Sequence, residues 1–155
     1  MLEALAAWPV AAALRGSAVL YPLVNAAHIL GIGLLIGTIA ALDLRLLGAF
    51  RAVPLAAVAP MLVRMAGTGL ALAAATGFLL FTTRPATYAE NPAFLLKLGL
   101  IGLGLANVLL LRRGEGWRAV LAGAAPGPTV RATALASLLL WIGAIFAGRW
   151  IGFLQ

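Results

Sequence analysis

Residues 18–47 read AVLYPLVNAAHILGIGLLIGTIAALDLRLL, and this stretch decides the fold. Its charged side chains are Asp43 and Arg45, both within the last five positions, and His28 is its single imidazole. About 20 helical residues cross the ~30 Å hydrocarbon layer of a bilayer. No alternation with a period of two persists along the stretch, and backbone groups in lipid must be hydrogen-bonded within each helix. The stretch therefore predicts a transmembrane helix.

The composition of the whole chain agrees with a membrane environment. Of the 155 residues, 64% are apolar and 10% are charged, whereas a soluble domain is about half apolar and a quarter charged. This excludes an ordinary soluble domain, a disordered chain and a nucleic-acid-binding domain. The chain has no Cys, which excludes disulfides and thiolate metal sites.

Three further stretches are long and apolar enough to span, at about 60–81, 92–111 and 129–153. Asn91 followed by Pro92 is typical of a helix start, with Asn as the N-cap residue. The sequence therefore predicts an all-α fold, an integral membrane four-helix bundle.

Residues 1–15 are apolar around Trp8 and Pro9 but too short to span. The first basic residue, Arg15, follows this stretch. In a cleaved signal peptide, basic residues precede the apolar stretch. We expect a short N-terminal helix that lies in the membrane interface, with Trp8 at headgroup level. No second domain is indicated, and residues 1–155 are predicted to form a single membrane domain.

Basic residues predict the orientation of the bundle. Seven of them flank one side, namely Arg45, Arg51, Arg64, Arg112, Arg113, Arg118 and Arg131. The other side has four, namely Arg15, Arg84, Lys97 and Arg149. The positive-inside rule places the richer side in the cytoplasm and both termini in the periplasm. The abundance of Ala, Gly and Arg indicates a GC-rich bacterial genome, so the expected location is a bacterial inner membrane.

Polar residues are expected to share a layer in the outer half of the bundle. Tyr21 and Asn25 precede His28 by seven and three positions, so the three lie on one helix face. At ~1.5 Å per residue, Lys97 and Arg149 fall at a similar depth on the third and fourth spans.

His28 is an ionisable residue inside a membrane, which is a functional hypothesis by default. It could be a neutral imidazole hydrogen-bonded across helices, or it could be a ligand. A copper site with Met61 and Met65 is not feasible within one chain, because they lie several turns away on the second span. Haem b needs only one axial His, so His28 could bind haem iron.

The other candidates have two interpretations each. Lys97 could extend to the headgroups, or it could bind a propionate or a substrate carboxylate. Arg149, next to Trp150, has the same alternatives. Trp141 in the middle of its span is expected in the core or against a cofactor.

The sequence also predicts two structural features. Asp43 is the only acid within the spans, and Arg64, with Arg45 close by, is its expected ion-pair partner at the cytoplasmic edge. Gly33 and Gly37 form a small-xxx-small pair, which is typical of close helix packing.

Four motifs carry a resemblance to known membrane proteins. They are Asn25-Ala-Ala-His28-Ile, Leu42-Asp43-Leu44-Arg45, Asn91-Pro92-Ala93-Phe94 with Lys97-Leu98, and Trp141 with Gly148-Arg149-Trp150. Together they resemble an uncharacterised family of small bacterial four-helix membrane proteins. More distantly, they resemble the superfamily of the copper-resistance D-type membrane domain and the small membrane protoporphyrinogen oxidase.

The resemblance implies a four-helix fold, with His28 as an axial haem ligand and with Arg45 and Lys97 as functional residues. It does not extend to the oxidase reaction, because Ile39–Leu42 stand where the oxidase has an aromatic Tyr-x-Pro run.

Three functional hypotheses follow. The first is a haem-binding redox protein with His28 as iron ligand, Lys97 or Arg149 on the propionates and Trp141 on the ring. The second is a structural or assembly subunit of a homo-oligomer or a larger membrane complex, without chemistry of its own. The third is a small transporter or channel with His28, Asn25 and Asp43 along its path. No phosphate loop, catalytic triad or carboxylate pair supports a conventional hydrolase.

Overall fold

The computed structural model describes residues 2–154, which form eight α-helices and one short 3-10 helix, with no strand among them. In chain order these are α1 Leu2–Ala6, α2 Pro9–Gly16, α3 Leu20–Leu47, α4 Leu55–Thr83, α5 Pro85–Glu90, α6 Pro92–Arg113, α7 Glu115–Leu121, α8 Pro128–Trp150 and η1 Ile151–Phe153. Four of them, α3, α4, α6 and α8, are long and apolar enough to cross a membrane. The predicted all-α four-helix bundle is confirmed.

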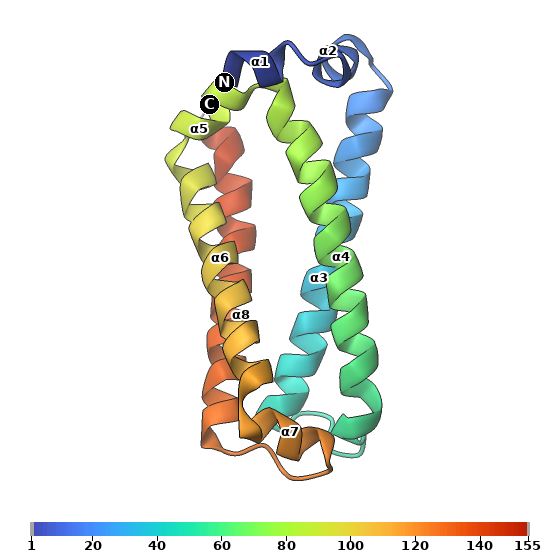
Figure 1. Ribbon diagram of the computed structural model, residues 1–155, viewed down its shortest axis with the longest axis vertical. Coiled ribbons are helices and arrows are strands. Elements are labelled where there is room, and N and C mark those ends of the chain that lie inside the picture. The colour runs from blue at the N-terminus through green and yellow to red at the C-terminus, as the bar shows by residue number, and fades with distance from the viewer. Residues whose placement is uncertain (1, 155) are drawn as a thin grey trace.

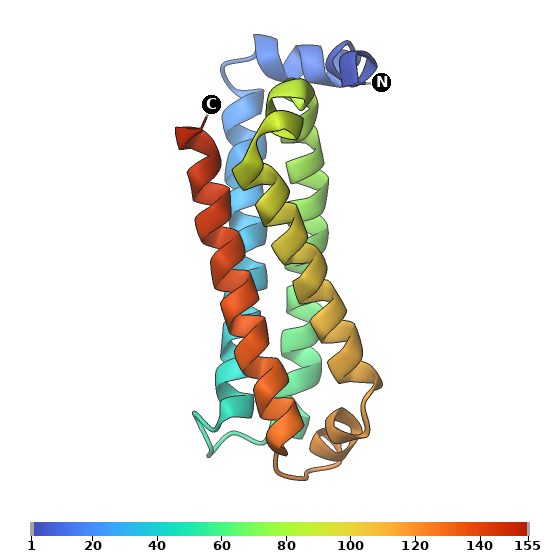
Figure 2. The same ribbon diagram turned by 90° about the vertical axis from the view of Figure 1, so that its left-hand side faces the viewer.

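The bundle consists of two antiparallel helix pairs. Figure 1 shows α3 beside α4 and α6 beside α8, and α3 also packs along α8. Within the described chain, no Cα of α4 comes within 8 Å of a Cα of α6. We call the end that carries both chain ends, α1, α2 and α5 the outer end, and the end that carries α7 the inner end (Figures 1 and 2). The two pairs diverge toward the outer end (Figure 1).

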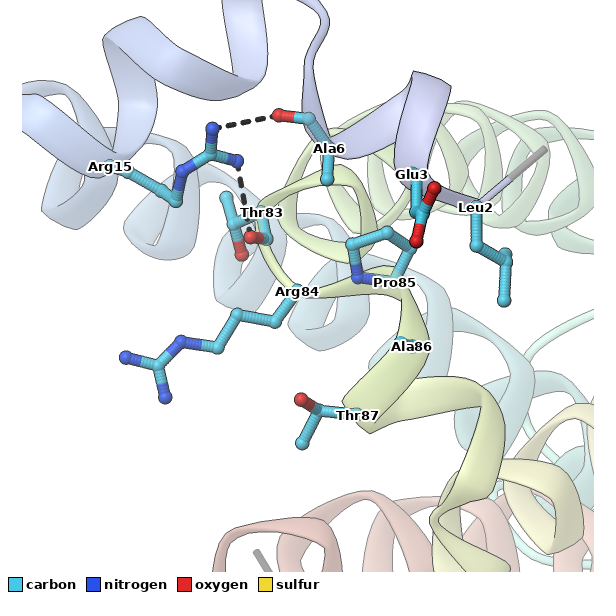
Figure 3. A pocket seen from close by; sticks show the side chains of 9 residues that line it. All are labelled: Leu2, Glu3, Ala6, Arg15, Thr83, Arg84, Pro85, Ala86 and Thr87. Carbon is cyan, nitrogen blue, oxygen red and sulfur yellow. Dashed lines mark hydrogen bonds between the residues drawn. The ribbon is translucent and has the colours of Figure 1, made fainter.

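The N-terminal segment is two short helices, where a single one was predicted. Trp8 adopts an extended conformation (φ −58°, ψ 134°), since a residue before proline is disfavoured in a helix, and Pro9 begins α2. The Arg15 guanidinium donates to the carbonyls of Ala6 (2.7 Å) and Thr83 (3.2 Å), as Figure 3 shows. Arg15 therefore ties α1 and α2 across the outer end of α4.

The second span begins at Leu55, five residues before the predicted start at Pro60. Pro60 lies inside α4 and lacks the N–H that would bond to the carbonyl four residues earlier. Membrane helices tolerate this loss. Two further helices, α5 and α7, fill connections for which no structure was predicted.

Gly31 and Gly69 form the closest helix contact, between α3 and α4. A Cβ at Gly31 would lie 2.7 Å from the Ala73 nitrogen, and one at Gly69 would lie 2.5 Å from the Leu35 nitrogen. By contrast, Gly33 and Gly37 have nothing within 4 Å of a Cβ placed on them. The packing predicted for that pair is therefore wrong within this chain, because α3 turns its Gly31 face toward α4.

Two apolar clusters fill the bundle. The inner cluster joins α7 to the long helices through Trp117, Val120, Leu46, Leu55, Ala59, Val130 and Ala134. The middle cluster is Leu35, Ile39 and Trp141, with Leu70 and Ile101 packed against it. At the outer end, the rings of Phe81, Tyr88 and Phe94 pack together, with Phe81 and Phe94 stacked at 5.6 Å. Between this aromatic group and the middle cluster lies the layer that contains His28.

Candidate functional site

His28 is half-buried on α3, with its ring against α4. Its Nδ1 lies 3.1 Å from the Thr76 hydroxyl oxygen, and Thr76 is itself buried. A Cβ at Gly77 would lie 2.9 Å from the His28 Cε1. The imidazole therefore packs against Gly77, and a side chain at that position would displace the ring.

The hydrogen bonds around the Thr76 hydroxyl favour one imidazole tautomer. The hydroxyl donates its one proton to the backbone carbonyl of Leu72, at 2.6 Å. With the hydroxyl proton in that bond, the Thr76 oxygen accepts from His28, and we therefore assign the N–H to Nδ1. In a neutral imidazole the other nitrogen, Nε2, is then unprotonated and carries the lone pair that a ligand would use.

Lys97 lies across the bundle from His28, on α6. Its side chain runs over Gly148 of α8, where a Cβ would lie 3.4 Å from the lysine Cδ and 3.6 Å from Nζ. Within residues 2–154 the half-buried ammonium has no hydrogen-bond or ion-pair partner. The layer therefore contains an imidazole with a free nitrogen and a cation without a counter-ion.

The other residues predicted for this layer do not join it. Tyr21 and Asn25 are exposed on α3 at the outer end, where the helix pairs diverge. Arg149 is exposed, with its guanidinium 4.7 Å from the centre of the Phe153 ring. Trp141 lies one layer further in, packed against Gly104, where a Cβ would lie 3.3 Å from the indole nitrogen. That nitrogen is buried and has no partner among the described residues.

Asp43 does not form the ion pair that the sequence suggested. It is 4% exposed and has Ser137 of α8 as its hydrogen-bonding neighbour. Its other oxygen, Oδ2, is buried without a partner in residues 2–154. The position of Asp43 on α3 turns the carboxylate toward the bundle interior, and within residues 2–154 it forms no ion pair with Arg45 or Arg64.

The two arginines have other surroundings. Arg64 is exposed on α4. Arg45 donates to the backbone carbonyls of Val53 (2.8 Å) and Arg51 (3.3 Å), so it caps the connection between α3 and α4. Neither guanidinium is paired with an acid in the described chain.

Thr76, Gly77, Gly148 and Ser137 were not predicted from the sequence as parts of these sites. The available signal was a hydroxyl or a glycine inside an apolar span, which is typical of helix–helix contacts in membranes. That signal does not say which helix faces which, so it could not single out these four positions.

Replacing Asp43 with Leu is expected to raise the free energy of unfolding by about 1–3 kcal/mol, since it removes a buried carboxylate oxygen that has no partner. Ser137→Ala is expected to destabilise the wild type but to have no effect beside Asp43→Leu. The measurement is thermal unfolding in detergent, followed by circular dichroism. It is made on the wild type, the two single variants and the double variant, which together form a double-mutant cycle. A less stable Asp43→Leu chain would mean that the carboxylate has a partner that stabilises it.

Comparison with known proteins gives a family but no characterised relative. A family model described as "Family of unknown function (DUF6644)" matches residues 15–154, a range that contains all four long helices. No curated protein and no solved structure matches the chain. The comparisons thus lend no support to the distant resemblance to the copper-resistance domain and the oxidase.

Proposed function

The chain belongs to DUF6644, a family of unknown function, and we propose that it is a haem-binding redox protein of the bacterial inner membrane, with His28 as the iron ligand. The observation that carries this proposal is the hydrogen bond between His28 and Thr76. With the Thr76 proton on the Leu72 carbonyl, this bond favours a proton on Nδ1 and a lone pair on Nε2, and a ligating imidazole is usually oriented in this way by a partner on its other nitrogen.

The donor set favours haem over a bare metal ion. Residues 2–154 hold no group of three His, Cys, Asp or Glu that could bind a metal. A porphyrin supplies four nitrogen ligands itself, so one imidazole from the protein is enough. Bound haem would supply one-electron redox chemistry.

Lys97 supports the same proposal from the other side of the layer. A half-buried ammonium without a counter-ion is costly inside a membrane protein. A haem propionate would supply the missing negative charge. His28 would then hold the iron, while Lys97 would fix the orientation of the macrocycle through its carboxylates.

The distribution of basic residues supports an orientation in which the His28 layer lies near the periplasm. The inner end carries six arginines, Arg45, Arg51, Arg112, Arg113, Arg118 and Arg131, whereas the outer end carries Arg15, Arg84 and Arg149. By the positive-inside rule the inner end is cytoplasmic. The layer of His28 would therefore lie in the periplasmic half of the bilayer.

Titration of detergent-purified apoprotein with haem tests this function. We expect a Soret band that saturates at one haem per chain and shifts on reduction with dithionite. Lys97→Gln is expected to weaken haem affinity about tenfold, because a hydrogen bond to a charged group is lost, and Lys97→Arg is expected to retain it.

Haem with esterified propionates is the matched control, because it should bind the wild type and Lys97→Gln with equal affinity. The absence of a saturable band in the wild type would refute the proposal. Equal affinities of the two chains for ordinary haem would refute the role of Lys97.

A second candidate function is that of a structural subunit, either of a homo-oligomer or of a larger membrane complex. It is favoured by Gly33 and Gly37, which are exposed on α3 with open space in front of them. Small residues of this spacing let another membrane helix approach closely. Light scattering of the purified protein in detergent, with Gly33→Leu as the disrupting variant, tests this role.

A further inference from the structure

A second feature of the molecule lies at the inner end, far from His28. A partly open cavity of about 410 Å³ lies between the connection of α3 to α4 and the connection of α7 to α8. Three arginines line it, Arg45, Arg51 and Arg131, and no acidic residue does. The cavity therefore has three positive charges and no negative charge in its lining. The proposed haem site does not explain this feature.

Backbone carbonyls hold two of these guanidinium groups in place. Arg45 donates from Nε and Nη2 to the carbonyls of Val53 and Arg51. Arg51 donates from Nε to the carbonyl of Gly48, at 3.0 Å, and folds over this glycine. Gly48 has a φ of 111°, which a residue with a side chain rarely adopts. The turn therefore fixes where the two cations lie.

These arginines keep unused donors. A guanidinium carries five N–H groups, and the carbonyls take only two from Arg45 and one from Arg51. The Arg131 side chain, in the first turns of α8, is exposed and makes no hydrogen bond or ion pair within residues 2–154. The cavity can therefore offer several N–H groups from three directions to one anion.

The rest of the lining is apolar. Leu46, Leu55 and Val120 are buried members of the inner cluster and form part of the cavity wall. The arginines and these apolar side chains together give an amphipathic site at the end of the spans, which is the depth of phospholipid headgroups.

We propose that this cavity, which we call the arginine pocket, binds a phosphate group. Guanidinium groups match phosphate oxygens in charge and in fork geometry, and they bind them with charge-assisted hydrogen bonds. The phosphate could come from an anionic phospholipid of the adjacent leaflet or from a soluble phosphate ester, and the chemistry of recognition is the same. The apolar wall favours the lipid.

The test uses the full chain in a neutral detergent and measures thermal stabilisation by added ligands. The ligands are phosphatidylglycerol, phosphatidylcholine and inorganic phosphate. The pocket variant is Arg51→Gln/Arg131→Gln, which leaves the Arg45 contacts with the connection intact. The control variant is Arg112→Gln/Arg113→Gln, which removes the same charge from exposed positions at the same end, outside the pocket lining.

We expect phosphatidylglycerol to stabilise the wild type and the control variant, with an apparent affinity at least tenfold lower in the pocket variant. Phosphatidylcholine should stabilise all three chains weakly and equally. Stabilisation by inorganic phosphate alone, lost in the pocket variant, would support the pocket but assign it to a soluble phosphate. If the pocket variant does not fold, Arg131→Gln alone replaces it, because the exposed Arg131 guanidinium makes no hydrogen bond or ion pair within residues 2–154.

Two results would overturn the proposal. Equal losses in the pocket and control variants would show a general attraction of anionic lipid to the basic end. No stabilisation of the wild type by either phosphatidylglycerol or inorganic phosphate would show that the pocket binds no phosphate.

Discussion

Replacing His28 with Ala is expected to abolish the Soret band of the haem-loaded protein. The reason is that no other imidazole exists in the chain and no thiolate can replace it. The measurement is a pair of visible spectra, oxidised and dithionite-reduced, of wild type and variant purified from the same haem-replete cells. Circular dichroism on the same samples shows whether the variant still folds.

Two variants separate ligation from packing. Thr76→Val keeps the size of the side chain but removes the oxygen that accepts from His28 Nδ1. It should retain the band and lower haem affinity by about 10–100-fold, as expected for loss of the group that orients a metal ligand. His28→Gly leaves room for free imidazole, and added imidazole should restore the band.

The spectra also distinguish the alternative functions. A His28→Ala chain that folds and keeps the wild-type spectrum would place the haem elsewhere and refute His28 as its ligand. If neither chain shows a band, His28 is a hydrogen-bonded packing residue. The structural role of the bundle is then the better explanation.

Much of the fold could be predicted from hydrophobicity alone, because the lipid environment requires long apolar helices. The limits of α3 and α6 agree with the predicted spans to within two residues at each end. The short helices α5 and α7 were missed since they are too short for any spanning signal. Pro60 misled the prediction of the start of α4, because proline usually marks the first turn of a helix.

For the candidate site, the sequence could identify unusual single residues but not the contacts between helices. His28 stands out as an ionisable group in an apolar span, and Lys97 as the chain's one lysine at a similar depth. Tyr21 and Asn25 have the spacing of one helix face, but periodicity does not show whether another helix covers that face at that height. Asp43 was expected to pair with Arg64 because both lie near one connection, yet the rotation of α3 turns the carboxylate to Ser137 of α8.

The second large effect is expected at the crossing of α3 and α4. Gly69→Ala should lower the free energy of unfolding by about 1–3 kcal/mol, the usual cost of overpacking. Its Cβ would lie 2.5 Å from the Leu35 nitrogen and 2.9 Å from the Gly31 oxygen. Both neighbours are backbone atoms, so the clash is relieved only if the two helices separate. Gly31→Ala should act in the same way, because its Cβ would meet the backbone of Ala73.

Gly33→Ala and Gly37→Ala are the matched controls on α3. Their Cβ atoms would enter open space, and alanine favours a helix over glycine by up to about 1 kcal/mol. Both should therefore leave thermal unfolding unchanged or raise its midpoint, while Gly69→Ala lowers it. An unaffected Gly69→Ala chain would contradict the close crossing of α3 and α4. Destabilisation by Gly33→Ala or Gly37→Ala would instead show that this outward face of α3 is covered by a second chain, because the single chain leaves it open.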